Sequence, residues 1–334
     1  MNIRKQKEQE ELKRLSKYAF KVVNTKGRKK EITPCEIRTD FERDRDRIIH
    51  SKSFRRLKHK TQVFISPETD HNRTRLTHTL EVSQISRSIA RALCLNEDLT
   101  EAIALGHDLG HTPFGHSGEQ ILNEICPFEF KHNLQSVRVV EEIESEGKGL
   151  NLTYEVIDGI KNHCHGFKPS TLEGEIVFFS DKIAYINHDI DDAIRFGVLK
   201  PSDIPKEYTD ILGETNSKRI NTMILDIIKN SYDKNKIKMS DEIFEATMGL
   251  RSFLFKNVYH SKRAMEEGDK GKTIVKRLYE YFMKHPDKML EEFYVRVNCD
   301  NLDRVVCDYV ACMSDIYAIN MYKELFIPNA YWGM

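Results

Sequence analysis

Apolar residues recur every three or four positions between Thr171 and Phe196, which is the spacing of one face of an α-helix. The residues that share this face are Ile176, Phe179, Ile183, Ile186, Ile190 and Ile194. The stretch therefore predicts a long amphipathic helix, and we expect a chain that carries one to be built mainly from packed helices.

Two further apolar faces each include a histidine. One lies in the segment 75–93 and consists of His78, Val82, Ile85 and Ile89, and the other consists of Leu99, Ile103 and His107. Gly110 and Pro113 then end the second helix, and Ser117-x-x-Gln120 resembles a capping box that opens another helix through Ile125. More helices are predicted at 133–145, 153–164, 218–231, 241–259, 272–283 and 302–319.

The fold class that follows is all-α, with at most a short β-ribbon between Val22-Val23 and Val63-Phe64-Ile65. Residues 1–31 are rich in Lys, Glu and Arg, and we expect them to form a frayed, solvated arm. We find no internal repeat and no low-complexity linker after Ile32.

The composition excludes several classes of protein. Lys plus Arg equals Asp plus Glu at 52 each, so no overall field attracts nucleic acid or a membrane. The seven cysteines form no CxxC pair, which argues against a zinc knuckle or a disulfide framework and fits a reducing compartment. No apolar run reaches the roughly 18 residues of a membrane span, and the N-terminus is charged. A cytoplasmic protein with no membrane partner is expected.

Three histidines and two carboxylates lie within the thirteen residues from His107 to Glu119, and one histidine directly precedes Asp108. A histidine on an apolar face is most often a hydrogen-bonded core residue, and a single His-Asp pair occurs often by chance. A buried carboxylate beside such a histidine changes this interpretation, because an uncompensated buried charge costs several kcal/mol and a cation offsets that cost.

The set His78, His107, Asp108 and Asp181 supplies two imidazole nitrogens and two carboxylates from three predicted helices. A roughly octahedral Mn²⁺, Fe²⁺, Mg²⁺ or Co²⁺ ion would keep two positions open for water and substrate. Zinc fits less well, because it prefers four ligands and the set has no thiolate.

The order His…His-Asp…Asp resembles that of the HD-domain phosphohydrolases, and longer motifs are similar to the bacterial dGTP triphosphohydrolase-like family. These motifs are residues 38–51, 54–57, 60–63, 75–82, 107–119, 181–185, 250–255 and 308–311. The resemblance implies an HD-domain fold with additional C-terminal helices. We expect the charged arm at 1–31, an HD-type catalytic core at 32–200, and a C-terminal helical region at 201–334 packed on that core as one continuous domain.

The activity that this resemblance implies is hydrolysis of a deoxynucleoside triphosphate to deoxynucleoside and inorganic tripolyphosphate, with one divalent metal ion per subunit. The four residues above would be its ligands. The 5′ oxygen is a poor leaving group without a proton, and His116 is the predicted acid, with Glu119 holding its tautomer. His111 is similar to a second active-site histidine of the family.

The resemblance also implies substrate contacts. Arg75 and Lys182 would meet the phosphates, and His132 would be a phosphate-side histidine. Tyr185 matches the aromatic residue that closes the 2′ position against ribonucleotides. The remaining members of the predicted substrate-binding set are Gln62, Val63 and Asp189.

Two other functions share these residues. An HD phosphodiesterase or nucleoside 5′-monophosphatase would use the same four ligands, but has no reason for the cluster of His111, His116 and Glu119. A nucleotide-sensing or nucleic-acid-binding scaffold would not need an intact catalytic site, yet every predicted metal-ligand and acid/base residue is present. By resemblance we also expect a symmetric homo-oligomer, with a dNTP or single-stranded DNA as a possible effector.

Overall fold

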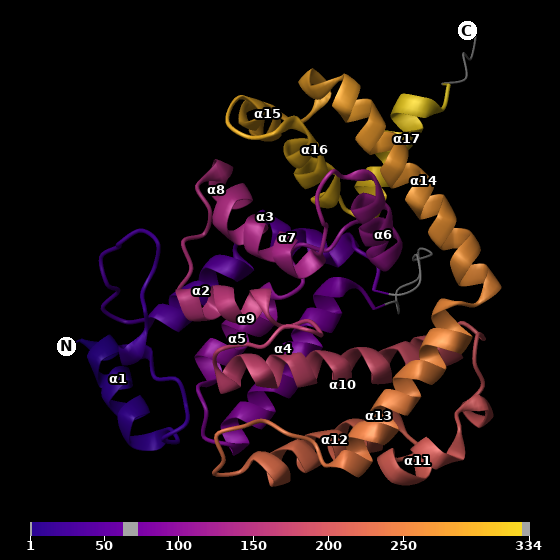
Figure 1. Ribbon diagram of the computed structural model, residues 1–334. Coiled ribbons are helices and arrows are strands. Elements are labelled where there is room, and N and C mark those ends of the chain that lie inside the picture. Colours follow the sequence, from indigo (N-terminus) through magenta and orange to yellow (C-terminus); the bar gives the residue numbers. More distant parts are fainter. Residues whose placement is uncertain (1, 63–72, 329–334) are drawn as a thin grey trace, which may run out of the picture.

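The computed structural model describes residues 2–62 and 73–328, and its regular elements are helices (Figure 1). Within those ranges β-pairing is limited to two isolated bridges, Arg28 with Thr153 and Thr61 with Thr74. The all-α prediction is therefore confirmed. The predicted ribbon is not formed at Val22-Val23, because Val22–Asn24 is a 3₁₀ turn, and Val63–Ile65 lie outside the described residues.

The N-terminal segment is ordered rather than frayed. Helix α1 (Ile3–Arg14) is followed by Leu15, Ala19 and Val22, which are buried in the core. Glu11 is buried too, and one of its carboxylate oxygens accepts a hydrogen bond of 2.8 Å from the backbone N–H of Val22. The expectation of a solvated arm was wrong because a few apolar residues between the charges suffice to anchor the segment.

The next helices form the packed centre of the molecule. They are α2 (Asp40–Ile49), α3 (Lys52–Arg56), α4 (Arg75–Ala92), α5 (Glu97–Gly106), α6 (Gly115–Ile125), α7 (His132–Arg138), α8 (Glu144–Gly147), α9 (Tyr154–Lys161) and α10 (Leu172–Arg195). Helix α5 packs against α2, α4, α9 and α10, and α10 packs across α4 (Figure 1). The C-terminal end of α5, the first turn of α4 and the middle of α10 thus meet inside the protein.

Local sequence explains where these three helices begin and which face they bury. Thr74 caps α4, Asn96 caps α5 and Thr171 caps α10, each accepting a backbone N–H from the first turn. The predicted faces of α4 and α5 are buried throughout, as are four positions of the α10 face; Phe179 and Ile194 are half-buried against the core. The helical periodicity therefore predicted the packing correctly.

The C-terminal part adds helices on two sides of this centre. They are α11 (Lys206–Leu212), α12 (Asn216–Ser231), α13 (Asp241–Leu254), α14 (Lys262–Lys284), α15 (Glu291–Tyr294), α16 (Leu302–Ala311) and α17 (Asp315–Phe326). Helices α12 and α13 pack against α10, whereas the long α14 passes α6 and reaches α16 and α17 (Figure 1). The C-terminal region therefore packs on the central helices in two places, through α12 and α13 against α10 and through α14 against α6.

Several predicted helix boundaries were wrong. The capping box does not form, because Phe114 (φ 61°) and Gly115 (φ 56°) turn the chain and α6 begins at Gly115, two residues before Ser117. The helix expected at 302–319 is two helices, since Ser314 caps α17 and ends the run. The segments 139–143 and 255–259 are π-helical turns, and α14 begins ten residues before its predicted start.

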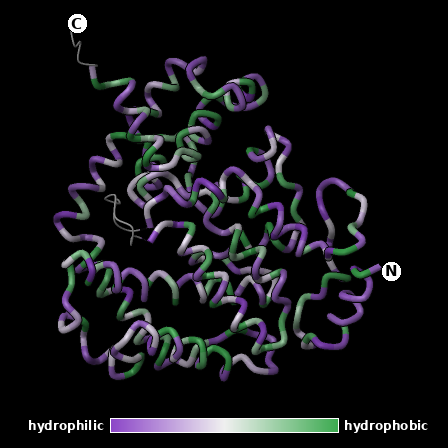
Figure 2. Tube along the Cα trace, turned by 180° about the vertical axis from the view of Figure 1, so that it is seen from behind, coloured by the Kyte–Doolittle hydropathy of each residue, from purple (hydrophilic) through white to green (hydrophobic). Residues whose placement is uncertain are grey.

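Polar and apolar residues alternate at short intervals along the helices (Figure 2). None of the helices in the described ranges is both long and apolar enough to cross a membrane.

Candidate metal centre and its histidine cluster

Three helices bring the four predicted metal ligands together. His78 lies on α4, His107 and Asp108 directly follow α5, and Asp181 lies on α10. The Nε2 atom of His78 is 3.1 Å from Oδ1 of Asp181 and 4.0 Å from Oδ2 of Asp108. The Nε2 atom of His107 is 3.4 Å from Oδ1 of Asp108 and 3.9 Å from Oδ1 of Asp181. Asp181 is half-buried and the other three residues are buried.

The loop after α5 is held against α7 by hydrogen bonds and by a close approach of the two backbones. The Ser136 hydroxyl on α7 donates to the carbonyl of His107 at 2.7 Å and accepts the N–H of Gly110 at 2.9 Å. A Cβ on Gly110 would lie 2.1 Å from the Ser136 nitrogen, so only glycine fits this approach. Gly110 therefore does more than end α5, because it lets the ligand-bearing loop rest on α7.

His107 carries the clearest sign of a cation. Its Nδ1 lies 2.6 Å from the carbonyl of Ala104, which accepts the ring N–H. The lone pair is then on Nε2, which is buried without a hydrogen-bond partner among the described residues and faces two carboxylates. A lone pair beside carboxylates is repelled, whereas a divalent ion between them satisfies all three groups. The donor set therefore fits a divalent metal ion.

The titration behaviour of these groups agrees with that geometry. Burial alone would raise the pKa of Asp108 and Asp181, but the nearby imidazoles hold the pKa of both carboxyls well below their usual range. Arg75 also lowers the pKa of Asp108, since its Nη1 donates a hydrogen bond to Oδ2 of Asp108 at 2.9 Å. The predicted phosphate contact Arg75 is thus buried against a candidate ligand.

The second half of the site contains the predicted acid and its neighbours. His111 stacks on His132 with ring centroids 4.0 Å apart, and its Nε2 lies 3.4 Å from Oδ1 of Asp108. Glu119 accepts from Nδ1 of His132 at 2.9 Å and lies 3.4 Å from Nδ1 of His116. The predicted His116–Glu119 pair is present, but Glu119 is closer to His132.

Exposure distinguishes the two histidines that share Glu119. The His116 side chain is 81% exposed, whereas His132 is half-buried. Burial opposes protonation of His132, yet its hydrogen bonds to Cys164 and Glu119 raise its pKa well above the usual value. The raised pKa of His132 therefore favours its protonated form, whereas His116 is the histidine of the pair that contacts solvent.

The predicted substrate residues lie along α10 and near the start of α4. The hydroxyl of Tyr185 accepts from Nε of Arg251 at 2.8 Å, and the hydroxyl of Tyr259 donates to Asp189, whose pKa burial raises to about 7. The Lys182 ammonium lies 2.9 Å from the centroid of the Phe178 ring, and burial lowers its pKa to about 8. Gln62 is half-buried, and Val63 lies outside the described residues.

Two residues that the sequence reasoning missed complete the cluster. His163 is buried with its ring centroid 5.0 Å from that of His107, and Cys164 follows it. The available signal was the run His163-Cys164-His165, which lies at the end of the helix predicted at 153–164.

Two family models match the chain. An HD domain model matches residues 75–186, which include all four candidate ligands, and a phosphohydrolase-associated domain model matches residues 237–324. A deoxyguanosinetriphosphate triphosphohydrolase-like protein of Caldanaerobacter subterraneus subsp. tengcongensis is 60% identical over 332 residues, covering 99% of this chain and 98% of that protein. A protein of the same description from Desulfatibacillum aliphaticivorans is 48% identical, covering 98% and 99%. A solved structure of a hypothetical protein from Aquifex aeolicus aligns with a TM-score of 0.49 at 20% identity, covering 85% of this chain and 71% of that one.

Proposed function

The chain belongs to the deoxyguanosinetriphosphate triphosphohydrolase-like family of HD-domain phosphohydrolases, and from that premise we propose that it hydrolyses deoxynucleoside triphosphates to deoxynucleoside and inorganic tripolyphosphate. The observation that supports this most is the buried Nε2 of His107, which faces two carboxylates and has no hydrogen-bond partner among the described residues. A divalent ion that this set would hold polarises a phosphoryl oxygen and lowers the pKa of a bound water.

The residues that would hold one ion per subunit are His78, His107, Asp108 and Asp181. Their nitrogen and oxygen donors suit Mn²⁺, Mg²⁺, Fe²⁺ or Co²⁺ better than Zn²⁺. Arg75 keeps Asp108 ionised and oriented through its 2.9 Å hydrogen bond, and it presents positive charge beside the place where the α-phosphate would lie.

Proton transfer to the departing 5′ oxygen is assigned to His116. Its exposed imidazole can take up a proton from solvent after each turnover, and Glu119 orients it through Nδ1. His132 has a raised pKa and stacks on His111, so this pair places a cation on the phosphate side of the site. Lys182 adds a second cation on α10.

Selection of the sugar is assigned to Tyr185, with Gln62, Val63 and Asp189 as further substrate contacts. Tyr185 lies one helical turn after Asp181, and the Arg251 hydrogen bond holds its ring in place. A fixed ring at this position would leave no room for a 2′-hydroxyl. The proposal further includes a cytoplasmic setting, a symmetric homo-oligomer, and a dNTP or single-stranded DNA effector.

Product analysis tests the proposal. The protein would be incubated with each dNTP and each NTP in Mn²⁺ or Mg²⁺, and the products would be separated by anion exchange. Tripolyphosphate and deoxynucleoside are expected, from dNTPs in preference to NTPs. Release of pyrophosphate with the nucleoside monophosphate would contradict cleavage at the 5′ oxygen. Parallel incubations with a deoxynucleoside monophosphate and a phosphodiester detect the two alternative phosphohydrolase activities.

A further inference from the structure

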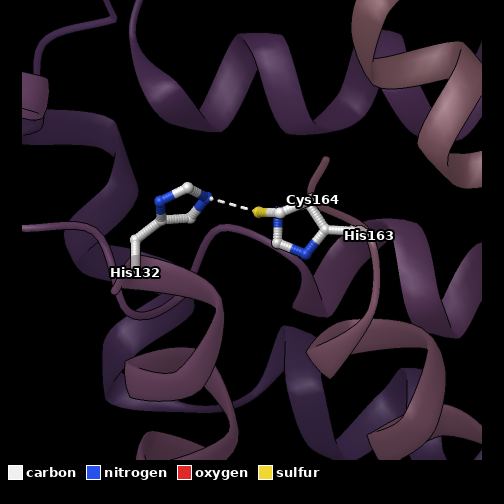
Figure 3. Close-up of side chains that lie close together, drawn as sticks. All are labelled: His132, His163 and Cys164. Carbon is white, nitrogen blue, oxygen red and sulfur yellow. Dashed lines mark hydrogen bonds between the residues drawn. The ribbon is translucent and has the colours of Figure 1, made fainter. Parts of the chain in front are cut away.

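His132, His163 and Cys164 come from two parts of the chain that lie side by side. His132 opens α7, whereas His163 and Cys164 follow the end of α9, and α7 packs against α9. The Cys164 Sγ lies 3.2 Å from Nε2 of His132 and 3.4 Å from Nε2 of His163 (Figure 3). One donor atom from each of the three residues lies within 4.8 Å of the other two.

Both imidazoles are oriented in the same way. Nδ1 of His163 donates to the carbonyl of Ile160 at 2.7 Å, and Nδ1 of His132 donates to Glu119 at 2.9 Å. With Nδ1 engaged in each ring, Nε2 is the atom that remains for a cation, and both Nε2 atoms face the same thiol. A histidine held by a carboxylate or carbonyl through its other nitrogen is the usual arrangement behind a metal ligand.

The distances suit a small tetrahedral ion. Zinc binds thiolate sulfur at about 2.3 Å and imidazole nitrogen at about 2.0–2.1 Å, which places the two donor atoms roughly 3.5 Å apart. The observed separations are 3.2 and 3.4 Å. Burial opposes ionisation of the thiol, but the neighbouring imidazoles lower the pKa of Cys164 to about 7. Cys164 and His132 are half-buried, so an ion from solvent can reach them.

We propose that His132, His163 and Cys164 form a second cation site, which takes a thiophilic divalent ion such as Zn²⁺ with water as its fourth ligand. This donor set is softer than that of the first site, so the two sites differ in the ions they prefer. Binding forms one metal–sulfur and two metal–nitrogen bonds, and the proton held by the thiol–imidazole group leaves to solvent. Because coordination occupies Nε2 of His132, zinc would also inhibit the hydrolysis. Only this expected inhibition rests on the proposed function.

Cobalt is the probe, because a cysteine thiolate gives Co²⁺ a sulfur-to-metal charge-transfer absorption. The full chain would be stripped with a chelator and titrated with Co²⁺ alongside the variants Cys164→Ser and His163→Gln. The matched control is Cys35→Ser, since backbone N–H groups also lower the pKa of the Cys35 thiol to about 7. Wild type and the control should show the absorption and bind one more equivalent of Co²⁺ than Cys164→Ser.

Absence of the absorption from the wild-type protein overturns the proposal, as does its persistence in Cys164→Ser. His163→Gln should weaken Co²⁺ binding at least tenfold while keeping the absorption at saturation, and unchanged affinity would also count against the site. Circular dichroism of each variant identifies any that fails to fold, and the wild-type result still decides. The readout is independent of catalysis, so a failure of the proposed function leaves it unaffected.

Discussion

Glu173 and Asp181 are carboxyl groups on the same helix, about two turns apart, and their surroundings differ. Glu173 is buried near the start of α10, where Oε1 accepts the backbone N–H groups of Phe20 and Asn96 at 3.0 Å each. Burial raises the pKa of Glu173 to about 7. Asp181 lies beside the imidazoles of His78 and His107, which hold its pKa well below the usual range.

The difference separates a structural carboxyl from one whose surroundings suit a metal ion. Glu173 joins α10 to the N-terminal segment and can do so without a charge. Asp181 stays ionised because the His78 side chain hydrogen-bonds to it, and its oxygens face buried ring nitrogens rather than backbone N–H groups. One helix thus carries a structural carboxyl near its start and a candidate metal ligand at its middle.

The largest expected effect is that of Asp181→Asn. The neutral amide binds a divalent ion weakly, so we expect loss of bound metal and a fall in dNTP hydrolysis on the order of 10³-fold, or about 4 kcal/mol. Metal content by mass spectrometry and kcat measure the two effects. Glu173→Gln, on the same helix, is the control and should keep both metal and activity. An Asp181→Asn protein with full metal content would remove Asp181 from the ligand set.

Glu173 makes stability depend on pH. Between its ordinary pKa of 4.5 and its folded pKa of about 7, the unfolded chain loses a proton that the folded chain keeps. The free energy of unfolding should therefore fall as pH rises through this window, by about 3 kcal/mol relative to Glu173→Gln. Urea unfolding of both proteins from pH 4.5 to 8 measures the difference. Parallel curves would mean that Glu173 is ionised in the folded protein.

The metal half of the site follows from the sequence because its residues lie on periodic helices. His78 and His107 share buried faces with Val82 and Leu99, and such faces can be read from spacing alone. The long α10 was predictable in the same way, whereas Asp181 lies off its apolar face and was assigned from the order His…His-Asp…Asp. Helix packing then brings the ligands together without help from irregular segments.

The other half depends on segments whose path the spacing does not encode. Phe114 and Gly115 turn the chain into α6, and Asp315 holds that turn by accepting the backbone N–H of Phe114 at 3.0 Å. Lys60 is buried and donates to the carbonyls of His111 and Ala311. These contacts join residues far apart in the chain, as does the meeting of His132 with Cys164.

His116→Gln tests whether hydrolysis needs the exposed His116 in addition to the buried charged residues of the site. We expect kcat to fall about 10²-fold with the metal retained, because the leaving oxygen loses its proton donor. Gln120→Ala, an exposed change on the same helix, should have no effect on kcat. His132→Gln is the informative comparison, since Glu119 lies nearer to His132. A loss of kcat there, with normal turnover by His116→Gln, would assign the acid to His132.

The smallest expected effect concerns Tyr185, one turn after Asp181. If its ring blocks a 2′-hydroxyl, Tyr185→Ala should reduce the preference for dNTPs over NTPs about tenfold, since a steric contact of this kind contributes modestly to selectivity. Tyr185→Phe keeps the ring but removes the acceptor for Arg251, so it should retain the preference. The ratio of kcat/KM for dGTP and GTP measures both. Equal loss of preference in the two variants would assign selectivity to the Arg251 hydrogen bond instead of the ring.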